Sequence, residues 1–137
     1  MKNKLKLSEI RIRDPFFLRV GETYYLYGTT DKNTWEGKGT GFDFYKSEDL
    51  VWFSGPFEAF RPASDFWADR NFWAPEVWEY ENTFYMIASF KSEGRCRGVQ
   101  ILSSSSPEGP FVPLTEEPIT PESWECLDGT LVFENGK

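Results

Sequence analysis

Two aspartates occupy the same place in a sequence pattern that this chain repeats, and carboxylates placed in this way can perform acid–base chemistry. The pattern covers residues 14–27, returns over 74–87, and starts a third time with Asp128. Asp14 opens the first copy as Asp128 opens the third. Equivalent positions in successive repeats lie at an equivalent radius and depth of a repeat architecture. We therefore expect the two carboxylates to converge on one site.

Carboxylates are also the main acid–base groups that the composition offers. The chain has no histidine, which removes the usual base of a serine or cysteine nucleophile and the commonest metal ligand. Cys96 and Cys126 lack C-x-x-C spacing, so they predict neither a zinc site nor a disulfide framework, and a reducing compartment is the expectation. The serine run 103–106 has no base beside it and is expected to be a strand end and turn.

Charge and aromatic content narrow the class of partner. A net charge of −7 at pH 7 argues against nucleic acid or an anionic membrane surface, because binding to phosphate requires clustered Lys and Arg. The 18% aromatic content indicates either an aromatic core or a surface that stacks on a ligand. Trp52 and Trp78 are expected in the core.

No segment of the sequence predicts export or membrane insertion. The first seven residues, 1–7, contain charges and no apolar segment of a signal peptide. No later stretch approaches the roughly 18 apolar residues of a membrane span. The sequence as it stands therefore predicts a cytoplasmic protein.

Short antiparallel strands are the elements that would position the aspartates. Each copy begins with two runs of β-branched and aromatic residues around a tight turn, which predicts a hairpin. A Gly-rich loop, a third strand, a Gly-Pro-Phe marker and a fourth strand follow. The predicted strands are 16–20, 23–27, 41–46 and 58–60 in the first copy, and 77–80, 83–88, 98–103 and 111–114 in the second. The third hairpin would turn at Asn135-Gly136.

Four short strands in a unit of roughly 55–60 residues indicate the blades of a β-propeller. The expected fold is therefore all-β, with four antiparallel strands in each blade, about two blades and the first strand of a third. The blades would cover about 10–62 and 68–116, and the third would start at about 124–137. The first strand of each blade lines the channel, so Asp14 and Asp128 should stand at its mouth.

The motifs resemble those of glycoside hydrolase family 43, the five-bladed β-propeller glycosidases. The resemblance rests on Arg-Asp-Pro-Phe at 13–16, Gly-Glu-Thr-Tyr-Tyr-Leu-Tyr at 21–27, Trp-Ala-Pro-Glu-Val at 73–77 and Leu-Asp-Gly-Thr-Leu at 127–131. It covers residues 10–137 and is specific to the family, not to a substrate. It implies hydrolysis of arabinose-, xylose- or galactose-containing glycans, with an oligosaccharide or polysaccharide as the partner.

The resemblance also implies roles for the two aspartates. Asp14 matches the general base that activates water, and Asp128 matches the aspartate that tunes the pKa of the general acid and orients it. The acid of the family is a glutamate in a later part of its sequence, beyond residue 137. Inverting hydrolysis needs both base and acid, so this chain alone is expected to be inactive. The open sheet edges of an incomplete propeller would favour self-association.

Further residues near the motifs are candidates for binding the glycan. Trp73 is the first candidate for stacking on a sugar face, because an aromatic ring suits its C–H side; packing between blades is the alternative. Trp35 and Trp67 could line a subsite. Glu76 stands two residues after the equivalent position of the second copy, on the face that Asp14 should share. It either contacts substrate or forms a buried ion pair with an arginine such as Arg70.

Two alternatives stay open. The string Trp-Glu-Cys at 124–126 resembles the one that carries the acid in the related fructan-cleaving propeller enzymes of family 32, which makes Glu125 an alternative acid. The alternation of side chains would place Glu125 and Asp128 on opposite faces of a strand. The chain could also be a non-catalytic carbohydrate-binding or scaffold propeller fragment.

No cofactor is required, and no residue indicates the calcium ion that some members of family 43 hold.

Overall fold

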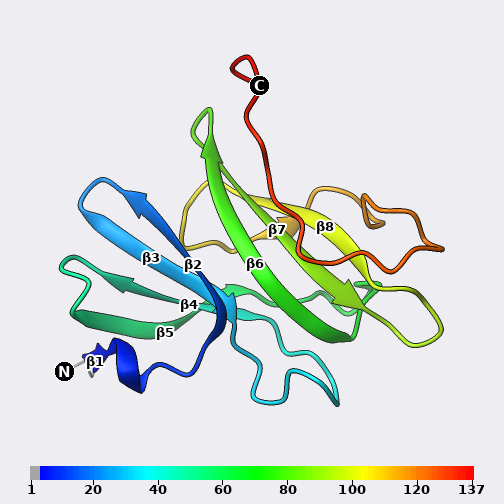
Figure 1. The fold of residues 1–137 in the computed structure, drawn as a ribbon, viewed down its shortest axis with the longest axis horizontal. Helices are drawn as coiled ribbons and strands as arrows, with labels where there is room; N and C mark the ends of the chain where they lie inside the picture. Colours follow the sequence, from blue (N-terminus) through cyan, green and yellow to red (C-terminus); the bar gives the residue numbers. More distant parts are fainter. Residues whose placement is uncertain (1–3) are drawn as a thin grey trace.

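Two antiparallel β-sheets contain the regular structure of the chain, in a computed structural model that describes residues 4–137 (Figure 1). The first sheet has the order β1-β5-β4-β3-β2 and the second the order β6-β7-β8-β9. The first is built from β1 (Leu5–Lys6), β2 (Arg13–Val20), β3 (Thr23–Thr29), β4 (Phe42–Ser47) and β5 (Trp52–Phe60). The second is built from β6 (Arg70–Tyr80), β7 (Thr83–Lys91), β8 (Gly98–Ser104) and β9 (Val112–Pro113).

Each sheet contains the four strands that the sequence predicted, so the all-β blade architecture is confirmed. The structure adds a short strand, β1, which pairs with β5 at the outer edge of the first sheet and leads into the 3₁₀ turn η1 (Leu7–Glu9). It also starts β5 at Trp52, ahead of the Gly-Pro-Phe marker. No helix in the part of the chain that the structure describes is long and apolar enough to cross a membrane.

The first two strands of each sheet form the predicted hairpins. Val20 pairs with Thr23, and Tyr80 pairs with Thr83, so each turn has two central residues. In the second turn Glu81 and Asn82 both have positive φ angles, 47° and 63°. A two-residue turn of this kind matches the right-handed twist of the strands that it joins.

The first strands of the two sheets lie side by side, as expected for adjacent blades. β6 packs against both β2 and β3 (Figure 1). The start of each copy in the sequence therefore lies at the junction between the sheets, and the later strands fan away from it.

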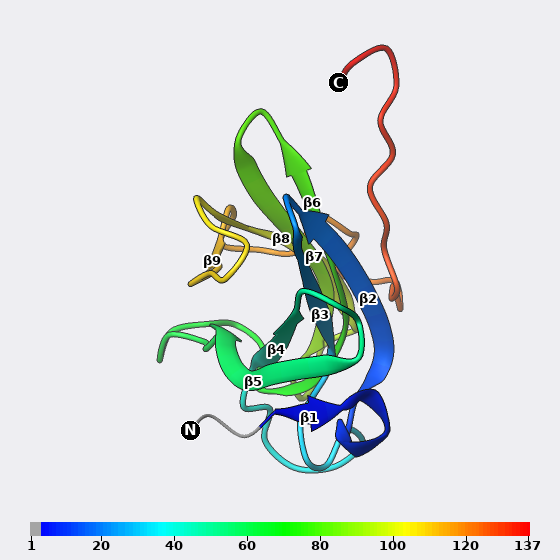
Figure 2. The same cartoon turned by 90° about the vertical axis from the view of Figure 1, so that its left-hand side faces the viewer.

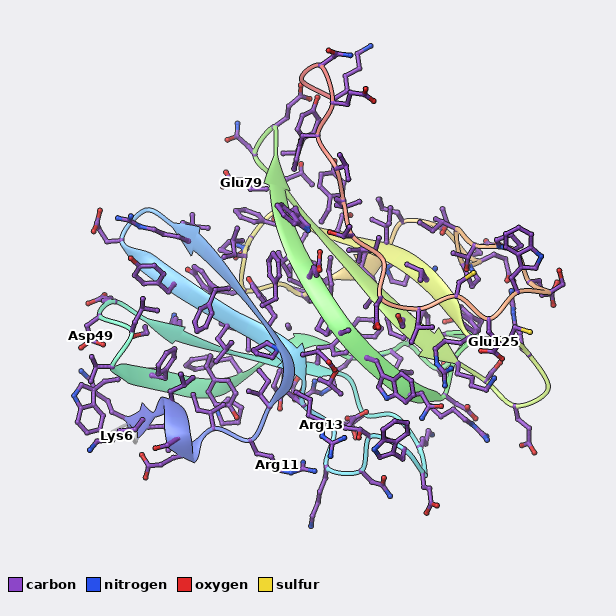
Figure 3. All side chains as sticks on the ribbon, viewed as in Figure 1. Lys6, Arg11, Arg13, Asp49, Glu79 and Glu125 are labelled. Carbon is purple, nitrogen blue, oxygen red and sulfur yellow. The ribbon has the colours of Figure 1, made fainter. Side chains whose placement is uncertain are left out.

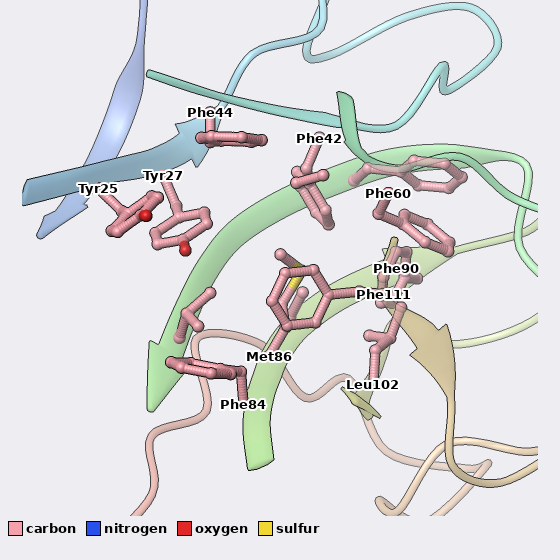
Figure 4. Close-up of a cluster of buried hydrophobic side chains, with 14 of the residues drawn as sticks. Tyr25, Tyr27, Phe42, Phe44, Phe60, Phe84, Met86, Phe90, Leu102 and Phe111 are labelled. Atoms are coloured by element: carbon pink, nitrogen blue, oxygen red, sulfur yellow. The ribbon is translucent and has the colours of Figure 1, made fainter. Parts of the chain in front are cut away.

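The space between the two sheets is filled by aromatic rings (Figure 4). Phe90 lies at the centre of the cluster, with ring centroids at 5.0 Å from Phe72, 5.7 Å from Phe42 and 5.8 Å from Phe60. All four side chains are buried. Much of the high aromatic content therefore forms the core that joins the blades, where ring pairs contribute beyond their buried area.

Trp52 does not belong to that core, so the prediction for this residue was wrong. Its side chain is 40% exposed, and the Lys6 ammonium lies 5.4 Å from its ring centre. The reason is the unpredicted strand β1, which pairs Lys6 with Trp52 at the outer edge of the sheet. Trp78 is half-buried and packs against Phe16 at 5.4 Å.

The third copy of the pattern runs beside β6 but does not pair with it as a β-strand. Among the described residues, 125–134 have no regular secondary structure, and the segment extends past the sheets to the C-terminus (Figure 2). Its turn is formed, because Glu134 and Lys137 exchange backbone hydrogen bonds of 2.9 and 3.0 Å across Asn135 and Gly136. The segment thus has the predicted hairpin turn, at the place expected for the start of a third blade.

Candidate active site

Asp14 lies in β2 at a β-bulge where the backbone turns left-handed. Its φ angle is 50°, and the pairing of β2 with β3 shifts register between Arg13 and Phe16. A left-handed conformation costs a non-glycine residue about 1–2 kcal/mol. Such a conformation persists only where the surrounding structure fixes it, and a bulge re-aims the side chain that it carries.

The same backbone conformation recurs at the equivalent position of each copy. Ala74 has a φ angle of 48° and Asp128 one of 55°. β6 also shifts its pairing with β7 between Trp73 and Glu76. The equivalence that the sequence pattern indicated is therefore present in the main chain, although the second copy has an alanine where the other two have a carboxylate.

Asp14 and Asp128 line one cavity of about 230 Å³. The structure thus brings together the two carboxylates that the repeat paired, and their chemical roles stay predictions. The remaining lining residues are Arg13, Thr29, Thr34, Trp35, Trp73 and Leu127. The lining combines carboxylates with aromatic rings, which is the composition of a site for a neutral polar ligand with an apolar face.

Trp35 and Trp73 form the aromatic side of the cavity. Their rings meet edge to face, with centroids 5.1 Å apart and planes at 69°. Trp73 Nε1 donates a hydrogen bond of 2.6 Å to the Thr34 carbonyl, which fixes the ring orientation. Trp35 is 67% exposed. It is therefore the ring that a ligand can reach most readily.

Arg97 stacks on Trp73 and connects it to Asn71. Its guanidinium carbon lies 4.2 Å from the centre of the Trp73 ring, and Nη2 donates 3.3 Å to Asn71 Oδ1. The Asn71 amide in turn donates hydrogen bonds of 3.1 Å to the carbonyls of Thr34 and Trp35. The loop that carries Trp35 is thus held to the second sheet.

Glu76 lies outside the set that lines the cavity. Its Oε2 accepts hydrogen bonds from Trp78 Nε1 at 3.1 Å and from Thr130 Oγ1 at 2.7 Å, so it joins β6 to the third copy. The alternation that placed it with Asp14 fails because the bulge in β6 interrupts the period of two. Arg70 forms its ion pairs elsewhere, with Asp69 at 2.8 Å and Glu93 at 3.5 Å.

Glu125 lies near the end of β7 (Figure 3), where two basic residues hold its carboxylate. Its Oε1 accepts a hydrogen bond of 3.0 Å from Lys91 Nζ, and its Oε2 accepts one of 3.0 Å from the Arg97 backbone N–H. The hydrogen bond from Lys91, with that from Arg97, lowers the pKa of the Glu125 carboxyl. A general acid needs the opposite shift, so this environment favours an ionised carboxylate that anchors the 124–128 segment.

Trp67 lies at a different cavity, one of about 600 Å³ between the β5–β6 connection and β9. Its ring packs against Phe66, with the Arg95 guanidinium 4.7 Å from the ring centre.

Within the described residues no cluster of three or more potential ligands could hold a metal ion. Cys96 and Cys126 are free and half-buried.

Sequence reasoning missed three residues that shape the site: Thr29, Asn71 and Arg97. Thr29 and Ser89 occupy equivalent positions of the first two copies, so a longer alignment of the repeat would have found them. Asn71 and Arg97 act through contacts across the fold, and no local sequence signal marks them.

Comparison with known proteins places these motifs in one family. The family model for glycosyl hydrolases family 43 matches residues 7–137. The solved endo-arabinase from Bacteroides thetaiotaomicron is 40% identical, with a TM-score of 0.84 over 96% of this chain and 44% of its own. The solved endo-1,4-beta-xylanase from the same organism is 31% identical, with a TM-score of 0.70 over 90% of this chain and 39% of its own.

A curated relative matches over a similar part of its length. The extracellular exo-alpha-(1->5)-L-arabinofuranosidase ArbA of Cellvibrio japonicus (strain Ueda107) is 24% identical over 93% of this chain and 39% of its own sequence. The chain thus spans about two fifths of the length of the relatives that it matches.

Proposed function

The chain belongs to glycosyl hydrolases family 43, and we propose that it supplies the base side of a glycosidase active site that cleaves arabinose-containing glycans with inversion. The observation that carries the proposal is the shared cavity of Asp14 and Asp128 beside the exposed ring of Trp35. Inverting hydrolysis requires a carboxylate base that activates water, and an aromatic ring beside it offers an apolar surface for the sugar.

In the proposed reaction Asp14 accepts a proton from water while the water oxygen attacks the anomeric carbon. The bond from that carbon to the leaving oxygen breaks, and the oxygen takes a proton from a general acid. We place this acid, a glutamate, outside residues 1–137. Asp128 would orient it and tune its pKa. Residues 1–137 alone would then bind glycan weakly and turn over none.

The relatives support the choice of arabinose within the wider class of arabinose-, xylose- and galactose-containing glycans. The solved relative with 40% identity is described as an endo-arabinase, and the curated one as an exo-alpha-(1->5)-L-arabinofuranosidase. The xylanase matches at 31% identity and a lower TM-score. We therefore propose 1,5-linked arabino-oligosaccharides as the first substrates to assay.

The test is the Asp14→Asn variant of the complete protein, meaning this chain together with the blades that the proposal requires. Asparagine keeps the size of the side chain but cannot accept the proton, so kcat should fall by about 10²–10⁴-fold while binding of the oligosaccharide persists. Asp65→Asn is the matched control, because Asp65 is exposed and outside the cavity. Turnover by Asp14→Asn at the wild-type rate would sink the assignment.

A non-catalytic carbohydrate-binding role gives a different pattern in the same assay. The wild-type complete protein would then bind arabino-oligosaccharides, measured by calorimetry, without releasing any product. If hydrolysis occurs, NMR of the first product anomer decides the stereochemistry, and retention of configuration would exclude the inverting mechanism.

A further inference from the structure

A single buried hydroxyl connects the Asp14 carboxylate to the neighbouring sheet. Thr29, the last residue of β3, is 3% exposed. Its Oγ1 donates a hydrogen bond of 2.8 Å to Asp14 Oδ2 and accepts one of 2.9 Å from the backbone N–H of Ala74. Ala74 lies in β6, so the hydroxyl joins the two blades as well as the carboxylate.

The direction of these two hydrogen bonds is fixed by chemistry. A backbone N–H can only donate, so the Thr29 oxygen must accept from Ala74. A hydroxyl has one hydrogen, and it is therefore the group that faces Asp14 Oδ2. The hydroxyl thus holds one oxygen of the Asp14 carboxylate in place and so sets the direction in which the other oxygen points.

The second copy of the pattern shows which part of this arrangement is general. Ser89 stands at the position equivalent to Thr29, is fully buried, and its Oγ accepts a hydrogen bond of 2.8 Å from the Asp128 backbone N–H. In both copies the hydroxyl thus holds the left-handed residue that opens the next copy. Only the first copy has a carboxylate beside the hydroxyl, because the second has Ala74 where the first has Asp14.

We propose that Thr29 is a positioning residue for the reaction: its hydroxyl fixes the orientation of the Asp14 carboxylate and also accepts a hydrogen bond from the second blade. The inference rests on the proposed role of Asp14 as the base. Arg13 and Asp128 are the other charged groups that line the cavity with Asp14, and both remain in the variants described below.

The experiment compares Thr29→Val with Thr29→Ser in the complete enzyme. Valine keeps the shape but has no hydroxyl, so kcat should fall by about 10–100-fold through loss of alignment, with little change in KM. Serine retains the hydroxyl and should restore kcat.

Thr30→Val is the matched control. The Thr30 hydroxyl accepts a hydrogen bond of 2.9 Å from the Asp43 backbone N–H, away from the cavity. Its loss removes a comparable part-buried hydrogen bond without touching Asp14. The control should leave kcat and KM at their wild-type values.

The outcomes separate this inference from the proposed function. Thr29→Val with the kcat of the wild type, in an enzyme that Asp14→Asn inactivates, would overturn the positioning role alone. An active Asp14→Asn variant would overturn the proposed function. If Thr29→Val does not fold, Thr29→Ala replaces it. In the Asp14→Asn background the same Thr29 substitution should produce no further fall in rate, and an additive fall would contradict action through Asp14.

Discussion

The Arg97 guanidinium covers one face of Trp73, with its carbon 4.2 Å from the ring centre. The Trp35 ring meets the same indole edge to face at 5.1 Å. Trp73 was the first candidate for stacking on a sugar, yet its ring already contacts the Arg97 guanidinium and the Trp35 ring. The exposed ring of Trp35 lines the same cavity. Binding of a glycan by either ring stays a prediction, and the exposure of Trp35 makes it the first ring to test.

Replacing Trp35 by alanine should weaken glycan binding and leave the fold intact. An exposed ring contributes little to the core, whereas an aromatic contact to a ligand is worth about 1 kcal/mol, or roughly fivefold in affinity. Calorimetric titration with an arabino-oligosaccharide measures the loss, and thermal unfolding measures the stability. Trp35→Phe retains an aromatic face and should recover part of the affinity. Unchanged binding by Trp35→Ala would refute this role.

Replacing Ala74 by glycine should stabilise the protein. Ala74 has a φ angle of 48°, and glycine removes the strain of a left-handed alanine at the expense of a more flexible unfolded chain, for a net gain of about 0.5–1 kcal/mol. Urea unfolding measures the difference. Ala88→Gly in β7 is the control, because Ala88 is buried in regular strand and glycine there should destabilise. Equal losses in both variants would contradict the argument.

Stability should depend on pH through Asp31, whose carboxylate closes the loop that carries Trp35. Both Asp31 oxygens accept from the Thr40 backbone N–H at 3.1 Å, and burial raises the pKa of the carboxyl. The folded state therefore binds the proton more tightly than the unfolded state. Stability is lost as pH rises from the unfolded value near 3.8 through the folded pKa. Asp31→Asn should gain stability relative to the wild type over that window.

Asp49 provides the control of opposite sign for this pH experiment. Hydrogen bonds from the Trp52 and Val51 backbone N–H groups lower the pKa of the Asp49 carboxyl. Its contribution to stability is present above the unfolded value and is lost as pH falls through the folded pKa. Asp49→Asn should therefore lose stability relative to the wild type at neutral pH and converge with it in acid. Denaturant titrations at a series of pH values measure both variants, and slopes of the same sign would contradict the assignment.

The blades could be predicted from the sequence because their signals are local. Hairpins such as that between Val20 and Thr23 follow from alternating side chains and turn residues a few positions apart. The repeat then located Asp14 and Asp128 together. The short strand β1 left no such signal, since its two residues pair with Trp52 across a distance in sequence. The prediction that Trp52 lies in the core was wrong because β1 was not predicted.

The details of the site depended on contacts that no local pattern records. A bulge in β6 moved Glu76 out of the face that alternation assigned to it. The stacking of Arg97 on Trp73 joins the loop after β7 to β6, and the tether of the Trp35 loop by Asn71 joins two sheets. The first two features arise within the second sheet, and the hydrogen bonds of Asn71 form only once the two sheets are packed together.

The left-handed main chain shared by Asp14, Ala74 and Asp128 also bears on how such a protein changes over evolution. The backbone geometry recurs whether or not the side chain is acidic, so it belongs to the blade and not to the chemistry. A single replacement at one of these positions can add or remove a functional group without rebuilding a loop. The repeat thereby provides equivalent backbone positions that accept different side chains, and Ala74 occupies the one without a charge.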